Sequence, residues 1–349
     1  MKIFNNLYGQ IVSWENLALA WDEFKVGKTK KTDVMEFEFK LEQNLFVLHE
    51  ELVVKTYRHG PYASFYIRDP KVRHIHKATV RDRVLHHAVF RVLNPIFEST
   101  FIPNSFSCRV GKGTHKGVAV AEQLIRQASH NFTRPCYVLK CDVRKFFDSI
   151  EHSTLLGILK KKIIDPDVHW LLERIIGSFT ISYDNLFDRR GVPIGNLTSQ
   201  LFANVYLNEF DQYVKQELKV KYYARYTDDF MIVGSDRQYL ANLLPPISEF
   251  LRCRLKLVLH PKKISLRKYR QGVDFLGLVI LPHHRVLRNK TKHRMFRKLR
   301  YRVNEFKAGL IDEARLEQSL HSYQGVLSHA SAYHLGEEML NRFWWWMKE

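Results

Sequence analysis

Cysteine is scarce in this chain and is not arranged for metal or disulfide chemistry. The 349 residues include four cysteines, Cys108, Cys136, Cys141 and Cys253, with no CxxC pair. This spacing argues against a zinc cluster and a disulfide framework, and it favours a reducing cytosol. No stretch approaches the roughly 18 apolar residues that span a bilayer. The first residues also show no secretory signal, so we expect a soluble protein located in the cytoplasm.

Acidic residues are in short supply. The chain has 36 Asp and Glu against 55 Lys and Arg, which gives a formal net charge of +19. A protein this basic usually faces a polyanion, and nucleic acid is the commonest one, although a basic surface can also serve solubility alone. The hydrophobic fraction of 45% is that of a globular protein, and the length favours two or three subdomains.

No internal repeat or low-complexity segment interrupts the chain, and the spacing of apolar residues predicts a mixture of helices and strands. We expect helices over residues 14–24, 41–52, 82–97, 153–176, from 196–199 to 218, and 239–253. We expect strands over residues 62–67, 73–75, 136–142, 222–225, 230–233, 256–259 and 273–281. From His283 to Lys307 there are ten Lys or Arg and one acid, Glu305, which predicts a basic helical segment.

The segment Tyr226-Thr227-Asp228-Asp229 lies between two short apolar runs, a pattern that predicts a hairpin with two carboxylates at its tip. The strand that ends at Asp142 would add a third carboxylate. Three acids gathered in this way can hold two divalent ions, the arrangement that phosphoryl transfer to a hydroxyl group requires. Asp148 is expected at a helix start, where capping is favoured over metal binding.

These segments, in this order and spacing, resemble the palm motifs of reverse transcriptases. The motifs that carry the resemblance are Asp142…Phe147-Asp148, Gly195-Asn196-Leu197-Thr198-Ser199-Gln200 and Tyr226-Thr227-Asp228-Asp229, with further similarity at Arg68 to Arg73, Ser107 to Gly113, His260 to Lys263 and Phe275 to Gly277. The resemblance implies an α+β right-hand polymerase with fingers, a palm built on an antiparallel sheet and a helical thumb. The expected boundaries are 1–60 for an N-terminal helical extension, 61–135 for fingers with part of the palm, 136–282 for the palm and 283–349 for the basic thumb.

The resemblance also implies roles for individual residues. Asp142, Asp228 and Asp229 would be catalytic, with two Mg²⁺ ions, or Mn²⁺ in their place, held by Asp142, Asp228 and the backbone carbonyl of Val143. The residues expected to bind the dNTP are Arg68, Arg73, Phe147, Ile194, Gly195 and Lys263, with Phe147 as a steric gate against ribonucleotides and Lys262 left as the alternative to Lys263. The residues expected to bind primer and template are Arg109, Gln200, Phe275, Leu276, Gly277, Arg294, Arg297 and Lys298.

One departure narrows the resemblance. Most reverse transcriptases carry Gln-Gly-x-x-x-Ser-Pro, whereas this chain has Ile194 in place of the glutamine and Gln200 in place of the proline. This variant is similar to the enzymes of diversity-generating retroelements, which copy a template-repeat RNA with frequent errors opposite adenine. That likeness implies an RNA template, a DNA primer, dNTPs, a structured RNA and a small basic accessory protein as partners.

Three other interpretations stay open. The first is a retron or group II intron-like reverse transcriptase, although these usually keep the proline of the loop and intron enzymes carry further maturase sequence. The second is an inactive polymerase fold that binds RNA as a scaffold, which the intact acids argue against. The third is RNA-directed RNA synthesis, which conflicts with Phe147.

Overall fold

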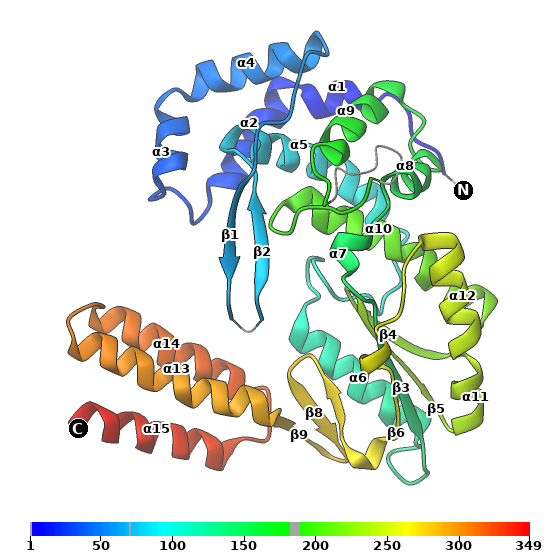
Figure 1. Ribbon diagram of the computed structural model, residues 1–349, viewed down its shortest axis with the longest axis vertical. Coiled ribbons are helices and arrows are strands. Elements are labelled where there is room, and N and C mark those ends of the chain that lie inside the picture. Colours follow the sequence, from blue (N-terminus) through cyan, green and yellow to red (C-terminus); the bar gives the residue numbers. More distant parts are fainter. Residues whose placement is uncertain (1, 70, 182–188) are drawn as a thin grey trace. The chain divides into compact units, whose positions relative to one another are not determined.

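The computed structural model describes residues 2–69, 71–181 and 189–349 of the chain, which form two compact units (Figure 1). The first unit comprises Met1–Pro103, Asp142–Lys219 and Pro245–Lys262. The second comprises Asn104–Cys141, Val220–Leu244 and Lys263–Glu349. The chain therefore passes between the units several times, so neither unit is a single stretch of sequence.

The first unit is mainly helical. Its elements are α1 (Tyr8–Val12), α2 (Trp14–Lys25), α3 (Thr32–Phe39), α4 (Leu41–Val53), β1 (Ala63–Ile67), β2 (Arg73–Lys77), α5 (Val80–Glu98), α7 (Phe146–Ser149), α8 (His152–Lys160), α9 (Pro166–Gly177), α10 (Leu197–Gln212), the π-helical turn η1 (Tyr213–Glu217), α12 (Leu244–Leu255) and the 3₁₀ turn η2 (Pro261–Lys263). The long helix α5 packs against α1, α2 and α10 and forms the centre of this unit. Apolar residues three or four positions apart on α2, namely Leu17, Trp21 and Phe24, are buried.

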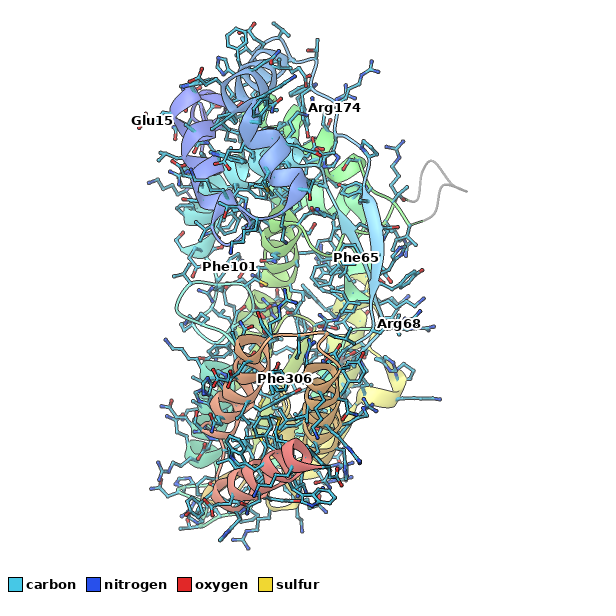
Figure 2. All side chains as sticks on the ribbon, turned by 90° about the vertical axis from the view of Figure 1, so that its left-hand side faces the viewer. Glu15, Phe65, Arg68, Phe101, Arg174 and Phe306 are labelled. Atoms are coloured by element: carbon cyan, nitrogen blue, oxygen red, sulfur yellow. The ribbon has the colours of Figure 1, made fainter. Side chains whose placement is uncertain are left out.

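A two-stranded antiparallel hairpin, β1 and β2, projects from this helical unit with both strands largely exposed. Its register runs from Ala63 opposite Lys77 to Ile67 opposite Arg73. Figure 2 shows Phe65 partway along the hairpin and Arg68 towards its far end. Pro70, part of the turn that the sequence predicts between the strands, lies outside the described residues.

The second unit is built on sheets. Its elements are α6 (Thr114–Ala128), β3 (Tyr137–Asp142), β4 (Tyr222–Tyr226), β5 (Asp229–Gly234), α11 (Arg237–Asn242), β6 (Ser265–Lys268), the 3₁₀ turn η3 (Tyr269–Gln271), β7 (Val273–Phe275), β8 (Leu278–Leu281), β9 (His284–Leu287), α13 (Asn289–Lys307), α14 (Glu313–Leu327) and α15 (Tyr333–Lys348). The strand order is β4-β5-β3-β6 in a four-stranded sheet and β7-β8-β9 in a three-stranded one. Asp142, the last residue of β3, opens the next segment of the first unit.

One hydrophobic core runs through the second unit, from α6 and the four-stranded sheet to the three C-terminal helices. Helices α13, α14 and α15 pack on one another, as Figure 1 shows. Phe343 and Trp346 of α15 are buried in this core, whereas Trp344 and Trp345 are 58% exposed. The run of consecutive aromatic residues therefore serves the core only at the positions that one helix face can bury.

Most predicted elements are present, but several boundaries were wrong. The helix expected over 153–176 is two helices, because Asp165 and Pro166 start α9, and the helix expected over 239–253 is likewise split into α11 and α12. Pro245, at the start of α12, has no backbone N–H to continue the hydrogen-bonding pattern of a preceding helix. Helix α3 lies in the N-terminal region expected to be helical, whereas helix α6 was not predicted. Residues 284–287, at the start of the expected basic helical segment, form strand β9 instead.

Two strand predictions also failed. Residues 256–259 form no strand; Lys256 has a φ of +52°, and only Leu259 makes a bridge, to Val143. The single strand expected over 273–281 is the hairpin of β7 and β8, because Leu276 and Gly277 take φ values of +51° and +92° and reverse the chain. Asp148 was expected to cap a helix, but it lies inside α7, whose N-cap position is Lys145.

Among the described residues, no helix is both long and apolar enough to cross a lipid bilayer.

Candidate active site

The acidic hairpin forms as the sequence predicts. β4 and β5 are antiparallel, and Tyr226 lies opposite Asp229, so that Thr227 and Asp228 make a two-residue turn. Thr227 takes a φ of +52°, a left-handed conformation that costs energy for a β-branched residue and has to be stabilised by its surroundings.

Arg225 provides that stabilisation from beneath the turn. Its side chain is only 1% exposed, and its guanidinium donates to the carbonyl oxygen of Thr227 at 3.0 Å and to Oγ of Ser105 at 3.1 Å. The hydroxyl of Thr227 donates in turn to Oγ of Ser107 at 2.6 Å. One planar cation therefore joins the turn to a neighbouring segment, a role suited to the fixed fork of arginine.

The segment from Asn104 to Ser107 runs beside β4. The backbone N–H of Arg225 donates to the carbonyl of Asn104 at 2.9 Å, and the N–H of Phe106 donates to the carbonyl of Arg225 at 3.0 Å. The side chain of Asn104 also donates to the carbonyl of Tyr223 at 3.0 Å. This segment therefore fixes the hairpin through both its backbone and its side chains.

Lys140 offsets part of the negative charge at the tip. Its ammonium lies 3.1 Å from a carboxylate oxygen of Asp229 and donates to the carbonyl of Asp274 at 2.9 Å. The side chains of Lys140 and Asp229 are each 21% exposed, so solvent screens this ion pair only partly. Two adjacent carboxylates repel each other, and pairing one of them with Lys140 lowers the cost of holding both at one turn.

Asp142 and Val143 lie where β3 ends. The carbonyl of Asp142 accepts from the N–H of His260 at 2.8 Å, and the N–H of Arg144 donates to the carbonyl of Val258 at 2.9 Å. These bonds flank the antiparallel bridge between Val143 and Leu259, so the carbonyl of Val143 is not used by that pair of bonds. β3 and β5 are neighbours in the sheet, with Asp142 ending one strand and Asp229 beginning the other.

Phe147 and Ile194 lie in the first unit. The ring of Phe146 is buried, whereas Phe147 is half-buried and its ring centroid is 5.5 Å from that of Phe146. The core position in this aromatic pair therefore belongs to Phe146. The carbonyl of Ile194 accepts from the N–H of His76 on β2 at 3.1 Å, and the side chain of Ile194 is half-buried.

The predicted triphosphate contacts are distributed over both units. Arg68 and Arg73 are exposed at the far end of the β1–β2 hairpin. Gly195 is exposed with a φ of +117°, and a Cβ added there would lie 3.0 Å from Ile75. Lys262 belongs to the first unit and Lys263 to the second.

The predicted primer and template residues lie mostly in the second unit. Arg109 donates to the carbonyl of Ser105 at 2.8 Å and so also supports the segment beside β4. Phe275 is buried, and Leu276 with Gly277 forms the turn between β7 and β8. The remaining predicted residues are Gln200, which is half-buried near the start of α10, and Arg294, Arg297 and Lys298 on α13.

A basic pocket in the first unit was not predicted. Its lining includes Lys28, Lys31, Lys77 and Arg83, together with the rings of Phe24 and Phe65 and the residues Gly195 and Gln200. Burial and the charge of Arg83 lower the pKa of Lys28. The imidazole of His86 also lines the pocket; burial lowers its pKa to about 3, so it stays neutral at physiological pH. Concave basic surfaces with aromatic walls suit nucleic acid.

The sequence predicted the acidic hairpin but not the residues that hold it in place. Arg225 and Lys140 stand next to recognised motifs, but the sequence gives only a weak sign that they differ from solvated cations. The one available signal was that each lies within an apolar strand run, where a charged residue has to find a partner.

Oxygen donors dominate the predicted metal site, as Mg²⁺ prefers. Within residues 2–69, 71–181 and 189–349, no group of three or more His, Cys, Asp or Glu side chains is arranged to hold a metal ion. In enzymes that bind nucleotides, Mg²⁺ usually has one or two protein carboxylates as ligands, and substrate phosphates supply others. Two carboxylates and a backbone carbonyl are compatible with this coordination.

Comparison with protein families gives a match to the family described as "Reverse transcriptase (RNA-dependent DNA polymerase)" over residues 67–280, more than half of the chain. The matched range contains Asp142, Phe147, Ile194 and the acidic hairpin.

Several curated proteins are similar to this chain. Protein YkfC of Escherichia coli is 26% identical over 290 residues, which is 73% of this chain and 74% of that protein. The group II intron-encoded protein LtrA of Lactococcus lactis is 26% identical over 185 residues, 52% of this chain but 30% of LtrA. An uncharacterised 91 kDa protein in the cob intron of Schizosaccharomyces pombe is 26% identical over 136 residues, 39% of this chain and 16% of that protein.

The arginine beneath the turn gives a stability prediction. Replacing Arg225 with lysine keeps the charge, but a single ammonium lacks the fork that reaches both Thr227 and Ser105. Leaving one buried acceptor unpaired costs about 1–3 kcal/mol. Chemical denaturation of the Arg225→Lys variant should show that loss, whereas Arg237→Lys, at an exposed residue, should not. Equal stability of the two variants would mean that the buried guanidinium does not hold the turn.

Proposed function

We propose that this chain, which belongs to the reverse transcriptase family, synthesises DNA on an RNA template with two divalent metal ions. The observation that carries the proposal is the acidic hairpin at residues 226–229, inside the matched family range and fixed from beneath by Arg225. Burying a cation costs several kcal/mol of desolvation, and an ordinary solvated turn does not need a buried cation to form.

The metal ligands would be the carboxylates of Asp142 and Asp228 and the carbonyl of Val143, with Asp229 in support. The neighbouring positions of β3 and β5 in the sheet favour this set, as does the carbonyl of Val143, which its bridge to Leu259 does not use. When bound, two Mg²⁺ ions, or Mn²⁺ in their place, supply a lowered pKa for the attacking 3′-hydroxyl and positive charge for the departing pyrophosphate. The pairing of Asp229 with Lys140 fits a supporting role for that acid.

The dNTP would have separate contacts for its phosphates, its sugar and its base. The guanidinium groups of Arg68 and Arg73 suit triphosphate oxygens, and the half-buried ring of Phe147 suits a gate beneath the sugar. Ile194 and Gly195 would lie by the base pair, and Lys263, with Lys262 as the alternative, would approach the leaving pyrophosphate.

Template and primer would bind by charge and shape. Lys28 and Lys31, together with Lys77 and Arg83, which both pair with Asp33, give the pocket of the first unit a net positive lining for a phosphate backbone. In the second unit, the basic helix α13, with Arg297 exposed and Arg294 and Lys298 half-buried, suits a duplex. The turn Phe275–Gly277 suits the primer end, and Arg109 and Gln200 complete the predicted set. In this proposal residues 1–60 form the N-terminal extension, 61–135 the fingers with part of the palm, 136–282 the palm and 283–349 the thumb.

The finer assignment is to the diversity-generating type, which copies a template-repeat RNA into adenine-mutagenised cDNA in the cytoplasm. Ile194 and Gln200 in the loop before α10 support it. A basic accessory protein would be a partner. The exposed face of α3 and α4 fits such a partner, because it joins exposed apolar residues to glutamates in an otherwise basic chain; these residues are Met35, Phe39, Phe46, Val47, Glu36, Glu38 and Glu42.

A second candidate is a reverse transcriptase of the group II intron type. The similarity to LtrA favours it. The loop sequence argues against the group II intron type, because it has Ile194 and Gln200 where most reverse transcriptases have glutamine and proline.

Primer extension tests the activity. With an RNA template, a DNA primer, dNTPs and Mg²⁺, the wild-type chain should extend the primer. The Asp228→Asn variant should be slower by about a thousand-fold, the factor that corresponds to about 4 kcal/mol of lost transition-state stabilisation.

The matched control is Asp236→Asn, the same substitution at an exposed acid that caps α11, and it should extend normally. A wild-type chain that binds template and primer but adds no nucleotide would make the inactive scaffold the better interpretation. Faster addition of ribonucleotides than of deoxynucleotides would favour RNA synthesis.

A fidelity assay tests the finer assignment. If Ile194 weakens geometric checking of the base pair, Ile194→Gln should lower misincorporation opposite template adenine several-fold and leave errors opposite the other bases nearly unchanged. Ile164→Gln, the same swap at an exposed position, should leave the error spectrum as it is. An adenine error rate that does not respond to Ile194→Gln would remove the support for the mutagenic type.

A further inference from the structure

Asn196 occupies the N-cap position of α10, but its side chain does not cap the helix. Asparagine is among the best N-cap residues because its side-chain oxygen accepts from N–H groups of the first turn. Here the side chain makes no such bond, although it is only 1% exposed. Its side chain is hydrogen-bonded to another part of the chain instead.

Both ends of the Asn196 amide bond the backbone at the C-terminal end of β2, more than a hundred residues away in the sequence. Nδ2 donates to the carbonyl of His76 at 2.9 Å, and Oδ1 accepts from the N–H of Ala78 at 3.4 Å. An asparagine side chain carries the same donor and acceptor as a peptide group, so it can pair with a strand edge as backbone does.

The backbone before Asn196 continues this pairing. The N–H of His76 donates to the carbonyl of Ile194 at 3.1 Å. Between these bonds, Gly195 lies so close to β2 that an added Cβ would lie 3.0 Å from Cγ2 of Ile75. The segment Ile194–Asn196 is therefore attached to the edge of β2 by backbone, side chain and close packing together.

We propose that Asn196 is a positioning residue that couples the β1–β2 hairpin to the loop carrying Ile194 and Gly195. This inference rests on the proposed function, in which the hairpin bears the triphosphate-binding arginines and the loop lies beside the base pair. One side chain would then fix the distance between the phosphate and base contacts of the same nucleotide. Aspartate at the same cap position has no donor for the carbonyl of His76, and the shorter side chain of serine cannot reach both His76 and Ala78.

Two substitutions separate this role from helix capping. Aspartate and serine cap helices about as well as asparagine, so a mere cap would tolerate Asn196→Asp and Asn196→Ser. As a coupling residue, Asn196→Asp loses the donor and sets a carboxylate against the His76 carbonyl, and Asn196→Ser is too short to reach both groups. We expect the KM for dNTP to rise roughly 10-fold in each variant, the cost of one unmet buried hydrogen bond, with little change in template–primer affinity.

Asp236→Asn is the matched control, because it makes the reverse exchange at a cap whose side chain accepts from the N–H of Gln238 at 2.7 Å. It should leave the KM for dNTP unchanged. Wild-type kinetic constants for Asn196→Asp and Asn196→Ser would overturn the inference, as would equal losses of dNTP and template–primer binding.

A second measurement does not depend on activity. Hydrogen exchange in the free protein should show faster exchange at the amides of His76 and Ala78 in Asn196→Asp, with exchange in the α13–α15 helices unchanged. If the wild-type chain proves inactive, the proposed function fails, but this result still decides whether Asn196 holds the loop to β2. Unchanged protection at both amides would overturn the coupling.

Discussion

The buried guanidinium of Arg225 is the interaction on which the acidic hairpin depends. Burying an unpaired cation costs several kcal/mol, so this position is tolerable only when the donors of the arginine are satisfied. The acceptors include a carbonyl of the turn itself and the hydroxyl of Ser105 in a segment far away in the sequence. These hydrogen bonds stabilise the left-handed conformation of Thr227 and the turn between β4 and β5. They thereby fix the backbone position of Asp228 in that turn.

A lysine compensates part of the negative charge of the acidic hairpin. Asp229 is paired with Lys140, a residue of the adjacent strand that also binds the carbonyl of Asp274. In the first unit, Ile194 and Asn196 are hydrogen-bonded to the edge of β2. In each unit a candidate functional segment is thus held in place by hydrogen bonds or ion pairs to a distant part of the chain. Preorganised groups of this kind lower the reorganisation that a reaction requires.

Local patterns in the sequence were enough for many of the helices, the acidic hairpin and the order of the motifs, because periodicity and turn chemistry act over a few residues. They were not enough where a distant segment decides the outcome. The sequence predicts Asn196 near a helix N-cap, yet its side chain is hydrogen-bonded to the carbonyl of His76 on β2, 120 residues away. Lys256 interrupts a run of apolar residues that looked like a strand, and Leu276 with Gly277 turns another into a hairpin. The supporting roles of Arg225 and Lys140 likewise follow from tertiary contacts alone.

In the proposed function, Asp142 and Asp228 hold the same pair of metal ions. Electron paramagnetic resonance of Mn²⁺, titrated into the complex of the chain with an RNA template, a DNA primer and a dNTP, decides whether they do. We expect two bound ions in the wild type and in Asp236→Asn. We expect loss of tight binding in Asp142→Asn and in Asp228→Asn alike. If Asp142→Asn bound Mn²⁺ as the wild type does, the two acids would not share a metal site.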